Sequence, residues 1–167
     1  MASRELSRID AQERKIVDRF MQRKPVPLGA LATELGVEVR LSALRPGESG
    51  SIEMENGRFV IKINRHETRE RQRFTLAHEI AHYLLHRELV RSDGKISDTV
   101  LYRSGQPDRI EFEANRLAAD LIMPDELLKA DLSRIGKSLT EEAIEYLAGE
   151  WQVSRAAMEI KLGPVAA

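Results

Sequence analysis

Two histidines and a glutamate stand in the spacing H-E-x-x-H within the stretch RQRFTLAHEIAHYLLH, residues 71–86. Side chains four residues apart lie on one face of a helix, so His78 and His82 can both reach one metal ion at ~2.0–2.1 Å. Glu79 lies beside the first histidine without occupying a coordination position. From there its carboxylate can take a proton from a water molecule that the metal activates. The spacing therefore predicts a hydrolytic metal centre with Glu79 as the general base.

The setting of this motif favours a metal over coincidence. Phe74, Leu76, Ile80 and Leu84 surround it with apolar side chains. Burying two imidazoles and a carboxylate among them without a partner is costly, and a nearby cation removes that cost. The apolar neighbours therefore support a bound ion.

A third protein ligand has to come from elsewhere in the chain, because catalytic zinc takes three protein ligands and leaves one position for water. The sequence has no cysteine, so the ligand must be His, Asp or Glu. His86 would sit ~12 Å along the helix from His78, too far to share one ion, and is expected to be a helix-end residue. Acidic candidates on the next strongly amphipathic segment are Glu111, Glu113 and Asp120. Spacing alone does not choose between Glu111 and Glu113.

The elements that must position these residues follow from hydrophobic periodicity. Helical spacing predicts helices over residues 5–23, 28–36, from 67 onward, 109–123, 124–135, 138–153 and 154–163. Residues 37–64 alternate as strands, with a tight hairpin turn at Asn56-Gly57, and predict a small antiparallel sheet. Residues 87–108 show no sustained period and predict a long connection.

Two segments together resemble the ImmA/IrrE metallopeptidases: RFTLAHEIAHYLLH and, after a variable loop, EFEANRLAADLIMP. The opening PVPLGALATELGVEV and the strand before the motif, which ends in IKIN, match that family as well. The resemblance implies an α+β fold in which a small antiparallel or mixed sheet packs on helices that carry the H-E-x-x-H, a zincin-like core related to thermolysin. It implies a peptidase domain over residues 1–135, with residues 136–167 as a C-terminal helical extension packed on the same domain.

The resemblance also implies roles for individual residues. His78, His82 and Glu113 would bind Zn²⁺, with Mn²⁺ as the alternative ion, and Glu79 would be the base. Glu111 stays the alternative third ligand, and Asn115 and Asp120 are expected to support the site from behind the ligands. For the residue that stabilises the oxyanion, Tyr102 is the chosen candidate ahead of Tyr83.

The implied substrate is a protein, a helix-turn-helix repressor whose cleavage switches on a stress or mobile-element response. An extended substrate could pair with the strand RFVIKIN if that strand lies at the sheet edge. Two alternatives remain: a non-proteolytic sensor with the same fold, and a component of a toxin–antitoxin-like module that acts by protein binding.

Charge and composition limit the kinds of partner that the protein can bind. The net charge is −1, no apolar run is long enough to span a bilayer, and the N-terminus lacks the apolar region of a signal peptide, so a cytoplasmic protein without membrane contact is expected. The last two predicted helices and the short break between them have the spacing of a helix-turn-helix. Their acidic residues outnumber Arg155 and Lys161, which argues against direct nucleic-acid binding. The oligomeric state stays undecided.

Overall fold

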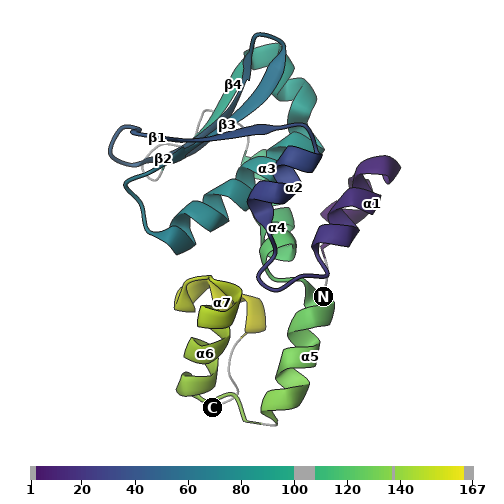
Figure 1. Cartoon of the computed structure of the whole chain (residues 1–167), viewed down its shortest axis with the longest axis vertical. Helices are drawn as coiled ribbons and strands as arrows, with labels where there is room; N and C mark the ends of the chain where they lie inside the picture. Colours follow the sequence, from purple (N-terminus) through teal and green to yellow (C-terminus); the bar gives the residue numbers. More distant parts are fainter. Residues whose placement is uncertain (1–2, 100–107, 137, 164–167) are drawn as a thin grey trace.

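A computed structural model of the chain describes residues 3–99, 108–136 and 138–163 (Figure 1). The described residues form an α+β fold of seven α-helices, one short 3-10 helix and one sheet of four strands. The elements are η1 (Arg4–Arg8), α1 (Ala11–Phe20), α2 (Leu28–Glu34), β1 (Glu38–Ser42), β2 (Glu48–Glu55), β3 (Arg58–Asn64), α3 (Arg69–Asp93), β4 (Lys95–Thr99), α4 (Asp108–Ile122), α5 (Asp125–Ile135), α6 (Glu141–Trp151) and α7 (Arg155–Leu162).

The sheet is mixed, with strand order β1-β3-β2-β4. β2 pairs antiparallel with both β3 and β4, whereas β1 pairs parallel with β3. The predicted hairpin is confirmed: Asn56 and Gly57 turn between β2 and β3 at φ 51° and 78°. The expectation that RFVIKIN is an edge strand is wrong, because this segment is β3 and lies between β1 and β2. One true edge is β4, which the sequence pattern hid because Ile96 is its one apolar residue.

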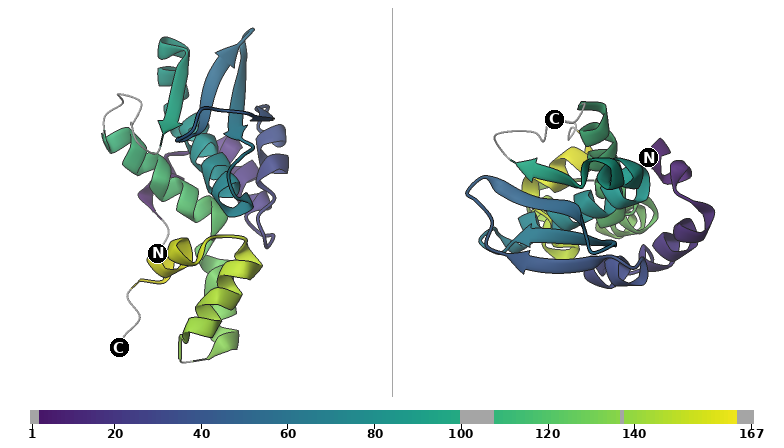
Figure 2. Two further views of the ribbon diagram at one scale, coloured as in Figure 1. Left: turned by 90° about the vertical axis from the view of Figure 1, so that its left-hand side faces the viewer. Right: turned by 90° about the horizontal axis from the view of Figure 1, so that it is seen from above.

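The helix that carries the H-E-x-x-H, α3, lies between the sheet and α4 (Figures 1 and 2). The Thr68 hydroxyl caps its first turn by accepting from the Arg71 N–H at 3.2 Å, and Gly94 ends it in the left-handed region at φ 83°. His86, which we expected to be a helix-end residue, lies at a kink where the backbone leaves helical geometry, at φ −128° and ψ 24°. Helical geometry then resumes and continues to Asp93.

The N-terminal segment forms two short helices where one was predicted over residues 5–23. η1 ends before Ile9, whose backbone is extended, and α1 then begins after Asp10. The Asp10 carboxylate accepts hydrogen bonds from the backbone N–H groups of Gln12 and Glu13. This N-cap fixes the start of α1 and explains the interruption, because a cap residue has non-helical backbone angles.

The three C-terminal helices occupy the lower part of the molecule as drawn in Figure 1. Trp151 of α6 is fully buried, and its ring N–H donates to the Asp131 carboxylate of α5 at 2.9 Å. Lys161 of α7 pairs with Asp120 of α4 at 3.4 Å and with Asp125 of α5 at 2.7 Å. These polar contacts tie α6 and α7 to α4 and α5. Among the described residues, none of the helices is both long and apolar enough to cross a bilayer.

Candidate metal centre

Three buried side chains from α3 and α4 bring one donor atom each to a common point. The Nε2 atoms of His78 and His82 are 3.1 Å apart. The Glu111 carboxylate bridges them, with one oxygen 3.1 Å from His78 Nε2 and the other 3.3 Å from His82 Nε2. At most 5 % of any of the three residues is exposed. The first two come from neighbouring turns of α3, and Glu111 enters from the first turns of α4.

These separations suit a divalent ion. Ligand atoms ~2.0–2.1 Å from one tetrahedral zinc lie about 3.3 Å from each other. The observed 3.1–3.3 Å between the donor atoms therefore leaves room for an ion with little rearrangement. Two imidazoles and one carboxylate are also a donor set that catalytic zinc uses. The residues present fit the group that the motif predicts.

The electrostatics of the site hold His82 and Glu111 in their metal-binding forms. Burial lowers the pKa of His82 to about 4, against the opposing pull of Glu111, so the imidazole is neutral near pH 7. Burial opposes ionisation of Glu111, yet its hydrogen bonds with His78 and His82 hold the pKa of this carboxyl well below its usual range. A neutral imidazole and an ionised carboxylate are the forms that bind a cation.

Asn115 orients one of the imidazoles. Its side-chain oxygen lies 2.9 Å from His78 Nδ1, so the ring donates an N–H there and keeps Nε2 free for a metal. This is the supporting position expected for Asn115. Glu79 lies on the same turn of α3 as His78 and is fully buried.

Glu113, the expected third ligand, does not join the cluster. One of its oxygens lies 3.0 Å from His86 Nε2, and the other forms an ion pair with Arg8. The physical reason is helix geometry. Residues two apart on α4 point to different sides of the helix, so Glu113 points away from His78 when Glu111 points toward it. Asn115 follows Glu111 by four residues, and both side chains lie on the face of α4 that meets His78.

Other expected site residues lie elsewhere. Asp120 accepts hydrogen bonds from the backbone N–H and hydroxyl of Ser3, which places it at the N-terminal segment rather than behind a ligand. The Tyr83 hydroxyl donates to the Leu35 carbonyl at 3.3 Å, so it points away from the donor cluster. Tyr102 lies outside the described residues.

A cleft of about 1150 Å³ lies between α3 and α4 on one side and α6 and α7 on the other, and the three donor residues are not among those that line it. Asn115 is part of its wall, next to the His78 ring that it orients. Phe74, Phe112 and Met123 give the wall an apolar character, and Phe112 is 55 % exposed. The cleft is large enough to receive side chains of a peptide.

Comparison with known proteins places this fold and site in a family. The chain is 42 % identical over 99 residues to the radiation response metalloprotease IrrE of Deinococcus deserti, which covers 57 % of this chain and 32 % of that protein. It is 32 % identical over 88 residues to the metallopeptidase ImmA of Bacillus subtilis, covering 53 % and 48 %. The chain thus spans half or less of the length of these relatives.

A solved structure of a Mycobacterium tuberculosis transcriptional regulator superposes with a TM-score of 0.58 at 13 % identity, over 92 % of this chain and 47 % of that one. This likeness concerns the fold alone. The sequence profile of the IrrE N-terminal-like domain, Peptidase_M78, matches residues 32–163. That span covers most of the chain and contains both H-E-x-x-H and the α4 carboxylate. The chain therefore belongs to the ImmA/IrrE family of IrrE N-terminal-like peptidase domains.

Proposed function

We propose that this protein is a zinc-dependent metallopeptidase that hydrolyses peptide bonds at the His78, His82 and Glu111 cluster. The observation that carries the proposal is the convergence of these three buried donor atoms within 4.8 Å of one another. Family membership and the metallopeptidase names of two relatives support it. Manganese is the alternative ion, because a His₂Glu site of nitrogen and oxygen donors binds either metal according to supply.

The chemistry divides between the ion and the chain. When bound, the ion would polarise the scissile carbonyl and lower the pKa of the attacking water. Glu79 would accept the proton of that water and deliver it to the leaving amine. Asn115 would keep the His78 ring in the tautomer that presents Nε2. The core of α3, α4 and the sheet would in this reading be the zincin-like arrangement that the resemblance implies.

The substrate would be a polypeptide bound beside α3 and α4. The apolar wall formed by Phe74, Phe112 and Met123 suits hydrophobic side chains of a peptide, and Asn115 connects that wall to the donor cluster. A helix-turn-helix repressor is our proposed physiological substrate, which would place the enzyme in control of a stress or mobile-element response. A repressor offers hydrophobic segments that such a cleft can hold once they unfold or detach.

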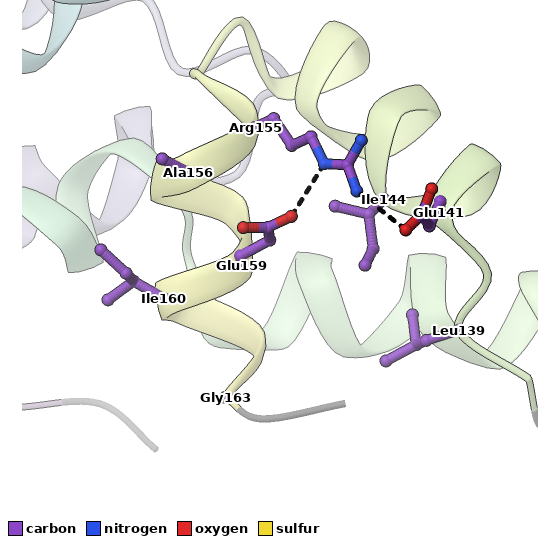
Figure 3. A pocket seen from close by; sticks show the side chains of 8 residues that line it. All are labelled: Leu139, Glu141, Ile144, Arg155, Ala156, Glu159, Ile160 and Gly163. Carbon is purple, nitrogen blue, oxygen red and sulfur yellow. Dashed lines mark hydrogen bonds and ion pairs between the residues drawn. The ribbon is translucent and has the colours of Figure 1, made fainter. Parts of the chain in front are cut away.

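Nucleic acid is a poor fit for the C-terminal helices. Arg155 at the start of α7 lies 2.8 Å from Glu159 and 3.7 Å from Glu141 (Figure 3), and 3.0 Å from Glu145. Lys161 is held by carboxylates of α4 and α5. Basic side chains committed to acidic partners do not form the positive face that DNA binding needs. We infer that α6 and α7 pack on the peptidase domain and line its cleft.

Two assays with the purified protein test the proposal. A quenched random-peptide library measures peptide hydrolysis without knowledge of the substrate, and mass spectrometry of candidate helix-turn-helix repressors identifies a cleavage site. Zinc-loaded protein should cleave in both assays, and chelator should abolish the activity. Glu79→Gln should keep its zinc, and its rate of hydrolysis should fall by about 10²–10⁴-fold, the usual contribution of a general base.

The outcomes separate the competing functions. Full hydrolysis by Glu79→Gln refutes the base assignment. A protein that binds zinc and a repressor but cleaves neither library nor repressor is instead a non-proteolytic sensor or a binding component of a two-gene module. Library cleavage with every repressor left intact keeps the peptidase and overturns the substrate proposal.

A further inference from the structure

Behind His82, a line of polar side chains leads from the donor cluster to the surface. His82 Nδ1 lies 3.0 Å from His86 Nδ1, and His86 Nε2 lies 3.0 Å from a Glu113 oxygen. Arg8 of η1 completes the line through its ion pair with the other Glu113 oxygen. His86 and Glu113 are only 7 % and 5 % exposed. The line joins three elements: α3, α4 and the N-terminal segment.

The hydrogen-bond chemistry of this line allows one consistent assignment when a metal occupies the cluster. A His82 ring that gives Nε2 to a metal carries its proton on Nδ1 and donates there. His86 Nδ1 must then accept, so His86 carries its own proton on Nε2 and donates to Glu113. The carboxylate accepts from His86 on one oxygen and from Arg8 on the other. Each contact along the line thus joins one donor to one acceptor.

Both imidazoles of the cluster are thus held from behind, in two different ways. His78 is held directly by Asn115 on α4. His82 is held through His86, one turn further along α3, because Glu113 itself does not reach His82 Nδ1. Glu113, which the family resemblance suggested as a ligand, contacts His86 and Arg8 instead.

We propose that His86, Glu113 and Arg8 form a positioning relay that fixes the tautomer and ring direction of His82 and so tightens metal binding. This inference rests on the proposed metal at His78, His82 and Glu111. It gives η1 a role at the metal centre, since Arg8 lies on that segment. None of the three relay residues belongs to the cluster of His78, His82 and Glu111, and none of them lines the cleft.

The N-terminal segment offers a matched control. Three ties join it to one side of α4: Ser3 to Asp120, Glu5 to Arg116 and Arg8 to Glu113. Glu5 is fully buried and its ion pair with Arg116 is 2.5 Å long, but neither residue touches His86. Glu5→Gln therefore removes the charge of a neighbouring ion pair on the same segment and keeps all three relay residues and their contacts.

The experiment measures zinc affinity by chelator competition, and the visible absorption of the Co²⁺-substituted protein, in the full chain. Glu113→Ala and His86→Leu should bind zinc about 10–100-fold more weakly than wild type. They should also shift the cobalt bands, because the His82 ring changes direction. Glu113→Gln keeps an acceptor oxygen for His86 and should lose less than Glu113→Ala. Arg8→Gln should also bind zinc more weakly than wild type. Glu5→Gln should match wild type in zinc affinity and in the cobalt spectrum.

Each contrary result has a definite meaning. Wild-type zinc affinity and an unchanged cobalt spectrum in folded Glu113→Ala overturn the relay. An equal loss in Glu5→Gln also overturns it, because segment docking would then be the cause. Should Glu113→Ala not fold, Arg8→Gln at the half-exposed end decides the question by the same readouts. Wild-type protein that never binds zinc overturns the proposed function itself, and the relay with it.

Discussion

Glu111 supplies the one negative charge of the donor cluster, and its removal should therefore have the largest effect on metal binding. Glu111→Gln leaves two neutral imidazoles and an amide around the ion. We expect zinc affinity to fall by more than the ~10–100-fold typical of a residue behind the ligands. Metal content after gel filtration, measured for Glu111→Gln and Glu113→Gln side by side, checks the ranking. Full zinc retention by Glu111→Gln would remove this residue from the ligand set.

At the residue scale, the sequence was most informative where chemistry constrains spacing within one helix. His78 and His82 could be paired because four residues separate them, and their Nε2 atoms do meet at 3.1 Å. The third donor comes from another helix, and its choice depends on how α4 is rotated against α3. That rotation follows from packing that no local pattern encodes, which is why Glu111 and Glu113 could not be separated on spacing alone.

The contact between β2 and α3 is close, and Gly50 permits it. A Cβ at this position would lie 2.6 Å from Thr75 Cγ2 on α3 and 2.7 Å from the Lys62 carbonyl oxygen on β3. The backbone oxygen cannot rotate away as a side chain can. Gly50→Ala should therefore lower the free energy of unfolding by about 1–3 kcal/mol through overpacking. Urea unfolding of the metal-free protein measures this without the added stability that a bound ion gives.

Gly149 of α6 is the control for this substitution. A Cβ there would meet nothing within 4 Å, and the residue lies inside a helix. Gly149→Ala should raise the free energy of unfolding by about 0.5–1 kcal/mol, because alanine loses less backbone entropy than glycine in a helix. Equal stability of Gly50→Ala and wild type would show that the sheet and α3 can separate without cost.

At the element scale, strong local signals were reliable and weak ones were not. The Asn56-Gly57 turn has the positive φ angles that its residues favour, so the hairpin followed from the sequence. β4 has five residues, of which Ile96 alone is apolar, so its sequence has no clear strand pattern. It is held as a strand by its pairing with β2. The parallel pairing of β1 with β3 likewise depends on tertiary structure, because β2 lies between these two strands in the sequence.

At the scale of the whole molecule, Asp131 joins three distant parts of the chain. Its carboxylate accepts from Trp151 of α6 at 2.9 Å and from Lys24, after α1, at 3.1 Å. It also forms an ion pair with Arg134 one turn further along α5. Burial opposes ionisation, but the hydrogen bonds from Lys24 and Trp151 hold the pKa of Asp131 below its usual value. Helix α6 is thus attached to α5 and to the segment after α1 through a charged contact as well as an apolar one.

The lowered pKa gives this contact a pH dependence of known sign. The ionised Asp131 is favoured in the folded state, so its contribution is fully present above the ordinary value of 3.8 and is lost as pH falls through the lowered folded value. Asp131→Asn should lower the free energy of unfolding at pH 7 by about 1.5–3 kcal/mol, the range for hydrogen bonds to charged groups. The difference from wild type should shrink as pH drops below 3.8.

Denaturant unfolding at pH 7 and at a pH below 3.8 measures the difference in stability between Asp131→Asn and wild type. Trp151 fluorescence reports the unfolding at the contact itself. Arg134→Gln is the matched control: Arg134 contacts the same carboxylate but its side chain is 72 % exposed, and exposed ion pairs contribute little. It should unfold at nearly the wild-type midpoint at pH 7. A loss in Asp131→Asn that is equal at both pH values would mean that the contact depends on the shape of the side chain and not on its charge. The attachment of α6 to α5 would then rest on the burial of Trp151 and on its hydrogen bond with residue 131, without a contribution from the charge.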